Sequence, residues 1–140
     1  MQASLVPYEQ ADAAWPLVEK YMVEAAKYTY GRYTSEDIRV SLLDGQRQLW
    51  VAFQDEVVYG AVVTQIMEYP QMRVLVMHFL GGIDGMKWKA PMLALLQRFA
   101  RDQKCRTIES TGRSGWARIF RDDGAQARSV FFELPVEPTT

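Results

Sequence analysis

The chain has 140 residues, of which 49% are hydrophobic and 24% are charged, and its formal net charge is -1 from 16 basic and 17 acidic side chains. This length and composition are typical of one globular domain with a substantial buried core. The balanced charge argues against the basic surface that a nucleic-acid-binding protein needs, so we expect no nucleic-acid partner.

Metal and disulfide chemistry are limited by the residue counts. The chain has one cysteine, Cys105, and one histidine, His78, so it has no cysteine pair and too few N or S ligands for a structural zinc site. No signal-peptide pattern follows Met1, and no run approaches the ~18 apolar residues of a membrane helix. We therefore expect a single domain over residues 1–140 in the cytoplasm, with no metal and no membrane partner.

The N-terminal part of the chain is expected to form a short strand and two helices. Residues 5–6 suit the strand. From Asp12 onward, apolar residues recur at spacings of three and four, which predicts a helix with one buried face. Thr34 with Asp37 three residues later predicts the N-cap of a second helix, and Gly45 is expected to end it.

Three strands joined by short turns are expected next. Apolar and polar residues alternate over residues 48–54, and further apolar runs follow at 57–67 and 73–80. The short turns between the runs predict an antiparallel meander. The run at 73–80 is almost continuously apolar, so we expect both of its faces to be covered.

The C-terminal part returns to alternating helices and strands. A helix is expected from residue 87 or 91 to 103, a strand over 107–110, a helix over 116–121 and a final strand over 129–134. The complete order is then β-α-α-β-β-β-α-β-α-β. It predicts the α/β class, with a mixed α+β sheet and helices on both faces.

This order resembles the GNAT N-acetyltransferase superfamily over essentially the whole chain. A closer resemblance, to the divergent GNAT-like proteins of bacteriophages, depends on short motifs. These motifs are Gly81-Gly82, Trp88, Lys104-Cys105, Gly112-Arg113-Ser114-Gly115-Trp116 and Gly124. The resemblance implies a single GNAT-like acyl-CoA N-acyltransferase fold.

The resemblance also implies an acetyl-CoA site where the fourth and fifth strands splay apart. It places the pyrophosphate at the start of the following helix, where free N–H groups attract an anion. The cofactor-binding residues that it implies are Phe79, Leu80, Gly81, Gly82, Gly85, Lys87 and Lys89. The chain departs from the family pattern here, because Trp88 and Pro91 replace the clustered glycines and proline donates no N–H. This departure argues against ordinary pyrophosphate binding.

Three residues are candidates for catalysis, each with a structural alternative. His78 suits a general base, with an ordinary pKa near 6.5, or a packed strand residue. Glu68 suits a proton acceptor or a turn carboxylate, and Glu109 suits a residue that orients the amine or the partner of a nearby arginine. The tyrosine that protonates the leaving thiolate in the family aligns with Phe120, so this general acid is missing.

Two functions remain open for such a chain. The first is a phage-type GNAT-fold protein with a degenerate acetyl-CoA site and a structural or protein-binding role, as a homo-oligomer or with a protein partner, incorporated in a phage particle. The second is an active N-acetyltransferase that acts on a small amine or a protein lysine. Tyr28, Tyr30 and Tyr33 suit a substrate wall or a protein contact. An open cleft between the fourth and fifth strands, walled by residues 81–85, favours the enzyme, and a cleft filled by Trp88 or Phe120 favours the scaffold.

Overall fold

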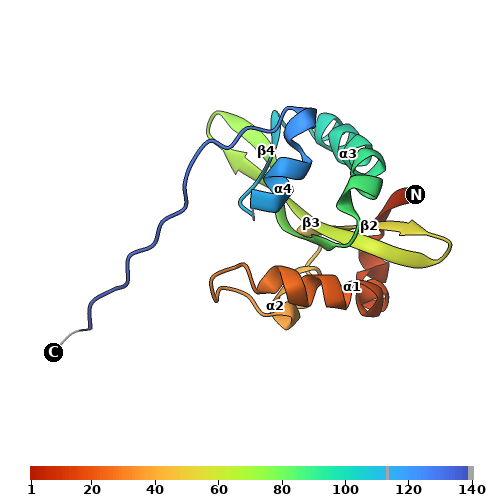
Figure 1. Cartoon of the computed structure of the whole chain (residues 1–140), viewed down its shortest axis with the longest axis horizontal. Helices are drawn as coiled ribbons and strands as arrows, with labels where there is room; N and C mark the ends of the chain where they lie inside the picture. Colours follow the sequence, from red (N-terminus) through yellow and green to blue (C-terminus); the bar gives the residue numbers. More distant parts are fainter. Residues whose placement is uncertain (113, 139–140) are drawn as a thin grey trace.

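The computed structural model describes residues 1–112 and 114–138, which form a sheet between two layers of helices (Figure 1). The elements are β1 (Gln2–Val6), α1 (Ala11–Ala26), α2 (Ser35–Ser41), β2 (Arg47–Gln54), β3 (Val57–Tyr69), β4 (Met72–Gly82), α3 (Gly85–Asp102), β5 (Thr107–Ser110) and α4 (Ser114–Ile119), with short 3-10 turns at Tyr8–Gln10 and Arg121–Asp123. The strand order is β1-β2-β3-β4-β5. The first four strands pair antiparallel, and β5 is parallel to β4. A parallel pair needs a long crossover, which α3 provides.

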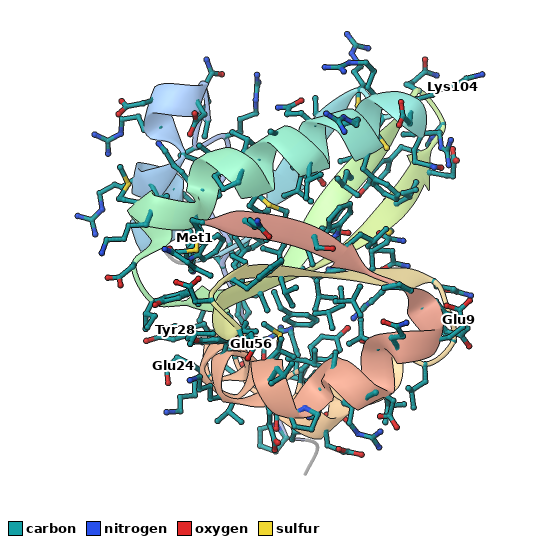
Figure 2. The ribbon with its side chains drawn as sticks, turned by 90° about the vertical axis from the view of Figure 1, so that its right-hand side faces the viewer. Met1, Glu9, Glu24, Tyr28, Glu56 and Lys104 are labelled. Atoms are coloured by element: carbon teal, nitrogen blue, oxygen red, sulfur yellow. The ribbon has the colours of Figure 1, made fainter. Side chains whose placement is uncertain are left out.

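The two faces of the sheet carry separate apolar cores. Figure 2 shows α1 on one side of the sheet and α3 on the other. On the α1 side, Val18 and Met22 are fully buried against side chains such as Val63 of β3. On the α3 side, Trp88 and Leu96 are fully buried against β2, β3 and β4. The expected mixed α+β class with helices on both faces is confirmed.

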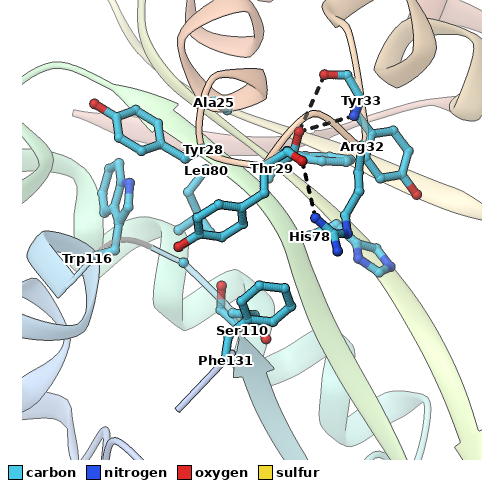
Figure 3. Close-up of a pocket in the computed structure, with 14 residues that line it drawn as sticks. Ala25, Tyr28, Thr29, Arg32, Tyr33, His78, Leu80, Ser110, Trp116 and Phe131 are labelled. Carbon is cyan, nitrogen blue, oxygen red and sulfur yellow. Dashed lines mark hydrogen bonds between the residues drawn. The ribbon is translucent and has the colours of Figure 1, made fainter. Parts of the chain in front are cut away.

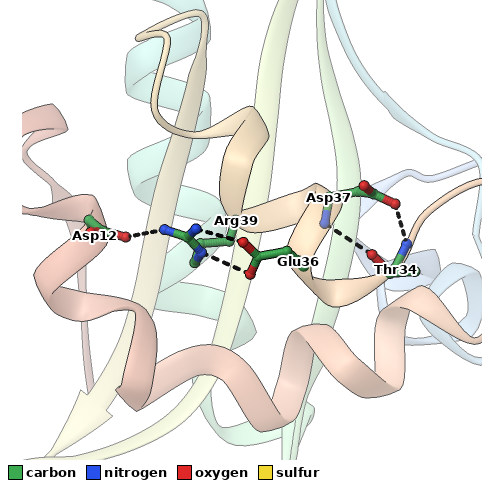
Figure 4. A network of polar contacts seen from close by, with 5 residues as sticks. All are labelled: Asp12, Thr34, Glu36, Asp37 and Arg39. Carbon is green, nitrogen blue, oxygen red and sulfur yellow. Dashed lines mark hydrogen bonds and ion pairs between the residues drawn. The ribbon is translucent and has the colours of Figure 1, made fainter.

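The segment between α1 and α2 is held in place by the polar contacts of Figure 4. Thr34 Oγ1 accepts from the Asp37 N–H at 3.1 Å, and Asp37 Oδ2 accepts from the Thr34 N–H at 2.8 Å, which confirms the expected cap. These hydrogen bonds lower the pKa of Asp37 below its usual value. Arg39 of α2 joins the two helices through Asp12 of α1 at 2.7 Å, and it also pairs with Glu36 of its own helix at 2.6 Å.

Replacing Thr34 with alanine is expected to lower the free energy of unfolding by about 1 kcal/mol, because an N–H of the first turn of α2 loses its side-chain acceptor. Urea denaturation measures this loss. Ser35→Ala is the matched control, since Ser35 follows the cap and is expected to change stability by less than about 0.5 kcal/mol. Equal losses in the two variants would show that the cap contributes nothing.

The boundaries of α3 differ from those expected. β4 continues through Gly82, two residues beyond the expected run at 73–80, and α3 already begins at Gly85. Pro91 lies inside the helix rather than at its start. The missing N–H of Pro91 falls only one turn further into the helix, and the packing of the α3 apolar face outweighs the lost hydrogen bond.

The expected final strand over residues 129–134 was wrong. Residues 125–138 form no helix or strand and extend away from the body as a C-terminal tail (Figure 1). Val130, Phe132 and Leu134 are 85%, 81% and 79% exposed. Residues with high strand propensity form a strand only where they can pair with a neighbouring strand and pack one face against other side chains. β5, the edge strand of the described sheet, is only four residues long and mostly exposed, so it offers little apolar surface to such a neighbour.

Candidate functional site

A pocket of about 250 Å³ opens where β4 and β5 diverge (Figure 3). Pairing between these strands ends at Met77 and Ser110, and the Ser110 hydroxyl donates to the Met77 carbonyl at 3.0 Å. Beyond this point β4 continues to Gly82 without β5 beside it. The lining from these elements comprises His78, Phe79 and Leu80 of β4, Ser110, Thr111 and Gly112 at the end of β5, and Trp116 of α4.

Tyrosines from the loop between α1 and α2 complete the wall. Tyr28, Tyr30 and Tyr33 all line the pocket, so this loop lies at the cleft as expected for an acceptor wall. Thr29 fixes the loop, because its hydroxyl donates to the Ala26 carbonyl at 2.8 Å and accepts from the Tyr33 N–H at 3.1 Å. Figure 3 shows Tyr28 and Trp116 on one side of the pocket and Tyr33 and His78 on the other.

The C-terminal tail contacts one edge of the pocket before it extends away from the body (Figure 1). Phe131 stacks on Tyr30, with ring centroids 5.1 Å apart and an interplanar angle of 10°. Two residues further on, Glu133 accepts from Arg32 Nη2 at 2.7 Å. The Arg32 guanidinium also lies 5.2 Å from the centroid of the Phe131 ring. The tail therefore brings an aromatic ring and a carboxylate to the same edge of the pocket.

His78 is the only sequence-predicted catalytic residue that lines the pocket. It lies at a β-bulge: Val63 is paired with Phe79 and Thr64 with Met77, so His78 has no opposite residue in β3. Bulges often redirect a side chain beside a functional site. Here His78 Nε2 lies 2.8 Å from Gln65 Oε1. Because an amide oxygen only accepts, this contact places the proton on Nε2 and leaves a lone pair on Nδ1.

Burial lowers the pKa of His78 to about 4, and the positive charge of Arg47 acts in the same direction. Arg47 Nε donates to the same Gln65 oxygen at 3.2 Å, and Arg47 Nη2 donates to the Tyr33 hydroxyl at 3.3 Å. The imidazole is therefore neutral at pH 7. It can accept a proton at Nδ1, but it does so weakly.

The low pKa of His78 predicts a loss of stability in acid. Between pH 6.5 and about 4 the unfolded chain binds a proton at His78 that the folded chain does not, so the free energy of unfolding falls as the pH falls through this window. Proton NMR measures the pKa directly, since the chain has a single histidine. In His78→Gln this part of the pH dependence is expected to disappear. A midpoint near 6.5 in the folded protein would contradict the prediction.

The two predicted carboxylates are placed outside the pocket. Glu68 forms an ion pair with Arg73 near the β3–β4 turn, at the opposite end of β4 from His78, and its side chain is 66% exposed. Glu109 is exposed on β5 and is not among the lining residues. Neither side chain is brought next to His78, and their catalytic roles stay predictions.

The predicted glycines allow close packing around the start of α3. A Cβ at Gly81 would collide with the backbone carbonyl of Tyr21 in α1. A Cβ at Gly82 would lie 2.6 Å from the carbonyl oxygen of Tyr59, and one at Gly85 would lie 3.1 Å from Ile119. Of the residues predicted to bind the cofactor, Phe79 and Leu80 line the pocket and these three glycines do not.

The two predicted lysines lie on the first turns of α3. Lys89 Nζ donates to the Ile119 carbonyl at 2.9 Å and lies 3.1 Å from Asp123, so it ties α3 to the end of α4. Lys87 is exposed. Neither lysine lines the pocket.

Trp88 and Phe120 do not fill the cleft. Both are buried in the core on the α3 side, where the Trp88 Nε1–H donates to the Ile83 carbonyl at 2.8 Å. Trp116 separates them from the pocket, with ring centroids 5.6 Å from Trp88 and 6.5 Å from Phe120. The pocket between β4 and β5 is therefore open rather than filled by these two side chains, but Gly81, Gly82 and Gly85 do not form its wall as expected.

The part of the chain that the structure describes contains no group of three or more histidine, cysteine, aspartate or glutamate side chains suited to a metal ion. Within those same residues, no helix combines the length and the apolar character that a membrane crossing requires.

Solved structures with the same fold match almost the whole chain. A probable acetyltransferase matches with a TM-score of 0.71 at 15% identity, over 99% of this chain and 100% of that one. A ribosomal-protein-alanine N-acetyltransferase from Brucella melitensis biovar Abortus 2308 matches with a TM-score of 0.66 at 15% identity, over 97% and 100%. An aminoglycoside acetyltransferase from an uncultured soil metagenomic sample, in complex with sisomicin, matches with a TM-score of 0.68 at 10% identity, over 97% and 96%.

Comparisons of the sequence itself found less. No protein-family profile matches the chain, and no curated protein matches it. The structural similarities show that the chain has the fold of the GNAT acetyltransferases.

Proposed function

We propose that this chain is an acetyl-CoA-dependent N-acetyltransferase whose reaction takes place in the cleft between β4 and β5. The observation that carries the proposal is the open pocket at the point where the two strands diverge, with His78, Phe79 and Leu80 on its wall. Neither of the bulky residues that would have blocked it, Trp88 and Phe120, lies in it.

The edge of β4 suits the cofactor arm. Beyond Met77 this edge is no longer paired with β5, so it can pair with the amide groups of an extended arm. The bound cofactor supplies an acetyl thioester, whose carbonyl carbon is the electrophile. A backbone N–H aimed at the carbonyl oxygen stabilises the charge that develops there.

The proton transfers depend on the residues that line the pocket. His78 is neutral and has a free lone pair on Nδ1, so it suits acceptance of the amine proton, directly or through water. Phe120, which follows α4, carries no hydroxyl and is buried, so it provides no general acid at this position. The hydroxyl of Tyr30, which lines the pocket, or solvent suits the donation of a proton to the thiolate.

Calorimetric titration with acetyl-CoA tests this proposal. We expect micromolar binding to the unmodified chain. Thr111→Trp, which places an indole in the pocket, should weaken binding by at least about tenfold. Thr107→Trp, at the other end of β5 and outside the pocket, is the matched control and should bind like the unmodified chain. Absence of heat at high acetyl-CoA concentration, or equal effects of the two tryptophans, would rule out this site.

A second candidate function is a structural or protein-binding role with a degenerate acetyl-CoA site, as a homo-oligomer or with a protein partner, in a phage particle. The start of α3 supports it, because the N-cap residue is Asp84, and a negative charge at this helix terminus disfavours the binding of a phosphate there. The tail supports it as well, because Val130, Phe132 and Leu134 form an uncovered apolar face. The phage assignment rests on the motif resemblance.

Light scattering tests this second function. An oligomer or complex that is lost when residues 125–140 are removed, in a chain that does not bind acetyl-CoA, would favour it. A monomer at high concentration that binds acetyl-CoA would contradict it.

A further inference from the structure

The charge around the pocket is positive among the described residues. None of the described lining residues is an aspartate or glutamate, and Arg32, the one of them that is charged at pH 7, is paired with Glu133 of the tail. Arg47 lies behind the wall, with its guanidinium carbon 5.7 Å from the ring centroids of both Tyr33 and Phe79. Arg47 has no carboxylate within ion-pair distance among the described residues, and its Nη1 atom is buried without a hydrogen-bond partner.

The positive charge near the pocket favours some acceptor amines over others. A polyamine or an aminoglycoside carries several positive charges, which the unpaired Arg47 repels and which no carboxylate among the described lining residues attracts. A ligand with a carboxylate is attracted instead. The volume of about 250 Å³ also favours a small acceptor, because it is below the usual range for drug-sized ligands.

The tail shows which groups suit the mouth of the pocket. It places the Phe131 ring flat on Tyr30 and the Glu133 carboxylate on Arg32. An acceptor with a ring and a carboxylate can make the same two types of contact, with Tyr30 and Arg32, in a pocket that aromatic side chains line on several sides.

The same residues also restrict the acceptor to an amine of low pKa. Only a neutral amine attacks a thioester, and an alkylamine with a pKa near 10.4 is neutral for only ~0.04% of the time at pH 7. The described lining residues include no carboxylate that could remove the extra proton, and burial leaves His78 a weak base. An amine on an aromatic ring is already neutral at pH 7, because the ring withdraws its lone pair.

We propose that the acceptor is an aromatic amine that carries a carboxylate, held by the tyrosine wall and by Arg32. This inference rests on the proposed acetyl transfer. In the reaction the amine nitrogen forms a bond to the acetyl carbonyl carbon, and the carbon–sulfur bond breaks. The amine loses one proton and the thiolate gains one, so the products are the N-acetyl arylamine and free coenzyme A thiol.

The test compares four acceptors with acetyl-CoA, through thiol release and the mass of the product. They are 4-aminobenzoate, the uncharged 4-aminobenzamide, the strongly basic 4-(aminomethyl)benzoate and the polycation spermidine. We expect kcat/KM for 4-aminobenzoate to exceed that of each of the others by at least about tenfold. Comparison with 4-aminobenzamide measures the contribution of the carboxylate, and comparison with 4-(aminomethyl)benzoate measures the contribution of the weakly basic amine.

Three variants locate the carboxylate. Arg32→Gln should raise KM for 4-aminobenzoate about tenfold and leave 4-aminobenzamide unchanged. Glu133→Gln should lower KM for 4-aminobenzoate, because it removes the carboxylate that competes for Arg32. Arg101→Gln, on the exposed last turn of α3, is the control and should leave KM unchanged for both substrates. Effects of the same sign at Arg32 and Glu133 would contradict the assignment.

The failure of this inference and that of the proposed function can be told apart. If acetyl-CoA binds and spermidine or the alkylamine is preferred, or none of the four is acetylated, the acceptor class is wrong while the cofactor site stands. If acetyl-CoA does not bind, the proposed function fails. Quenching of the tyrosine and tryptophan fluorescence by 4-aminobenzoate, lost in Arg32→Gln, then decides the ligand class independently, and no quenching would overturn it.

Discussion

Replacing Trp88 with alanine is expected to lower the free energy of unfolding by about 3–5 kcal/mol, the range for large aromatic residues in a core. Trp88 is fully buried on the α3 side of the sheet, and its ring lies against Gly60 of β3. The substitution removes this packing and leaves the Ile83 carbonyl without its donor. Urea denaturation, with unchanged slope, measures the loss.

Trp116→Ala is the matched control for this prediction. Trp116 is only half-buried in α4 and contacts the same region, so its loss should cost clearly less. Gly60 provides a second check, since a Cβ there would lie 2.5 Å from Trp88 Cζ2. Gly60→Ala should therefore destabilise the unmodified chain and have less effect in a Trp88→Phe background. Additive effects of these two substitutions would contradict the packing of Trp88 on Gly60.

Gly81→Ala is expected to lower the free energy of unfolding by about 1–3 kcal/mol or more, the usual effect of adding a methyl group to a filled core. The new Cβ would meet the backbone carbonyl of Tyr21, which cannot rotate away as a side chain can. Relief requires α1 to move from β4. Because α1 leads into the tyrosine loop, we also expect weaker acetyl-CoA binding in this variant.

The control for Gly81 is Gly115→Ala. Gly115 lies in α4, and a Cβ there would meet nothing within 4 Å. Alanine in a helix is more stable than glycine by roughly 0.5–1 kcal/mol, so this variant should be as stable as the unmodified chain or more so. If Gly81→Ala is equally harmless, the close approach of α1 to β4 is not as the structure has it.

The central strands and the two helices of the N-terminal half were predictable because each pattern reflects one buried face. Alternation over residues 48–54 and the apolar runs that follow correspond to β2, β3 and β4. The Thr34 and Asp37 pair is a local signal, and the cap formed as expected. Such signals need no knowledge of distant residues.

The C-terminal third was harder to predict because its outcome depends on partners far away in the chain. The alternation of residues 129–134 indicates a strand, but the described sheet offers no suitable neighbour for it. Two consecutive glycines usually indicate the end of a strand, yet Gly81 and Gly82 belong to β4. Glycine is needed there because the backbone carbonyls of Tyr21 and Tyr59 approach too closely for a side chain. No local pattern records these approaches.

The site was predictable in part. The sequence indicated the cleft, His78 and the tyrosine loop, and the structure brings them together. Arg32, Phe131 and Glu133 were missed, because only the path of the tail makes them neighbours across about a hundred residues of sequence. A resemblance assigns residues to a site by their position in a motif, and it cannot register a contact that the motif does not contain.

The bulge in β4 has one further consequence. His78 is the extra residue of the bulge, because the adjacent residues Val63 and Thr64 of β3 pair with Phe79 and Met77 on either side of it. Deleting it would close the register and leave Phe79 on the α1 side and Met77 on the α3 side, where they already lie. The sheet does not need this position, and the pocket takes its one imidazole from it. Deletion of this one residue would therefore remove the imidazole from the pocket without changing which side of the sheet the neighbouring residues face.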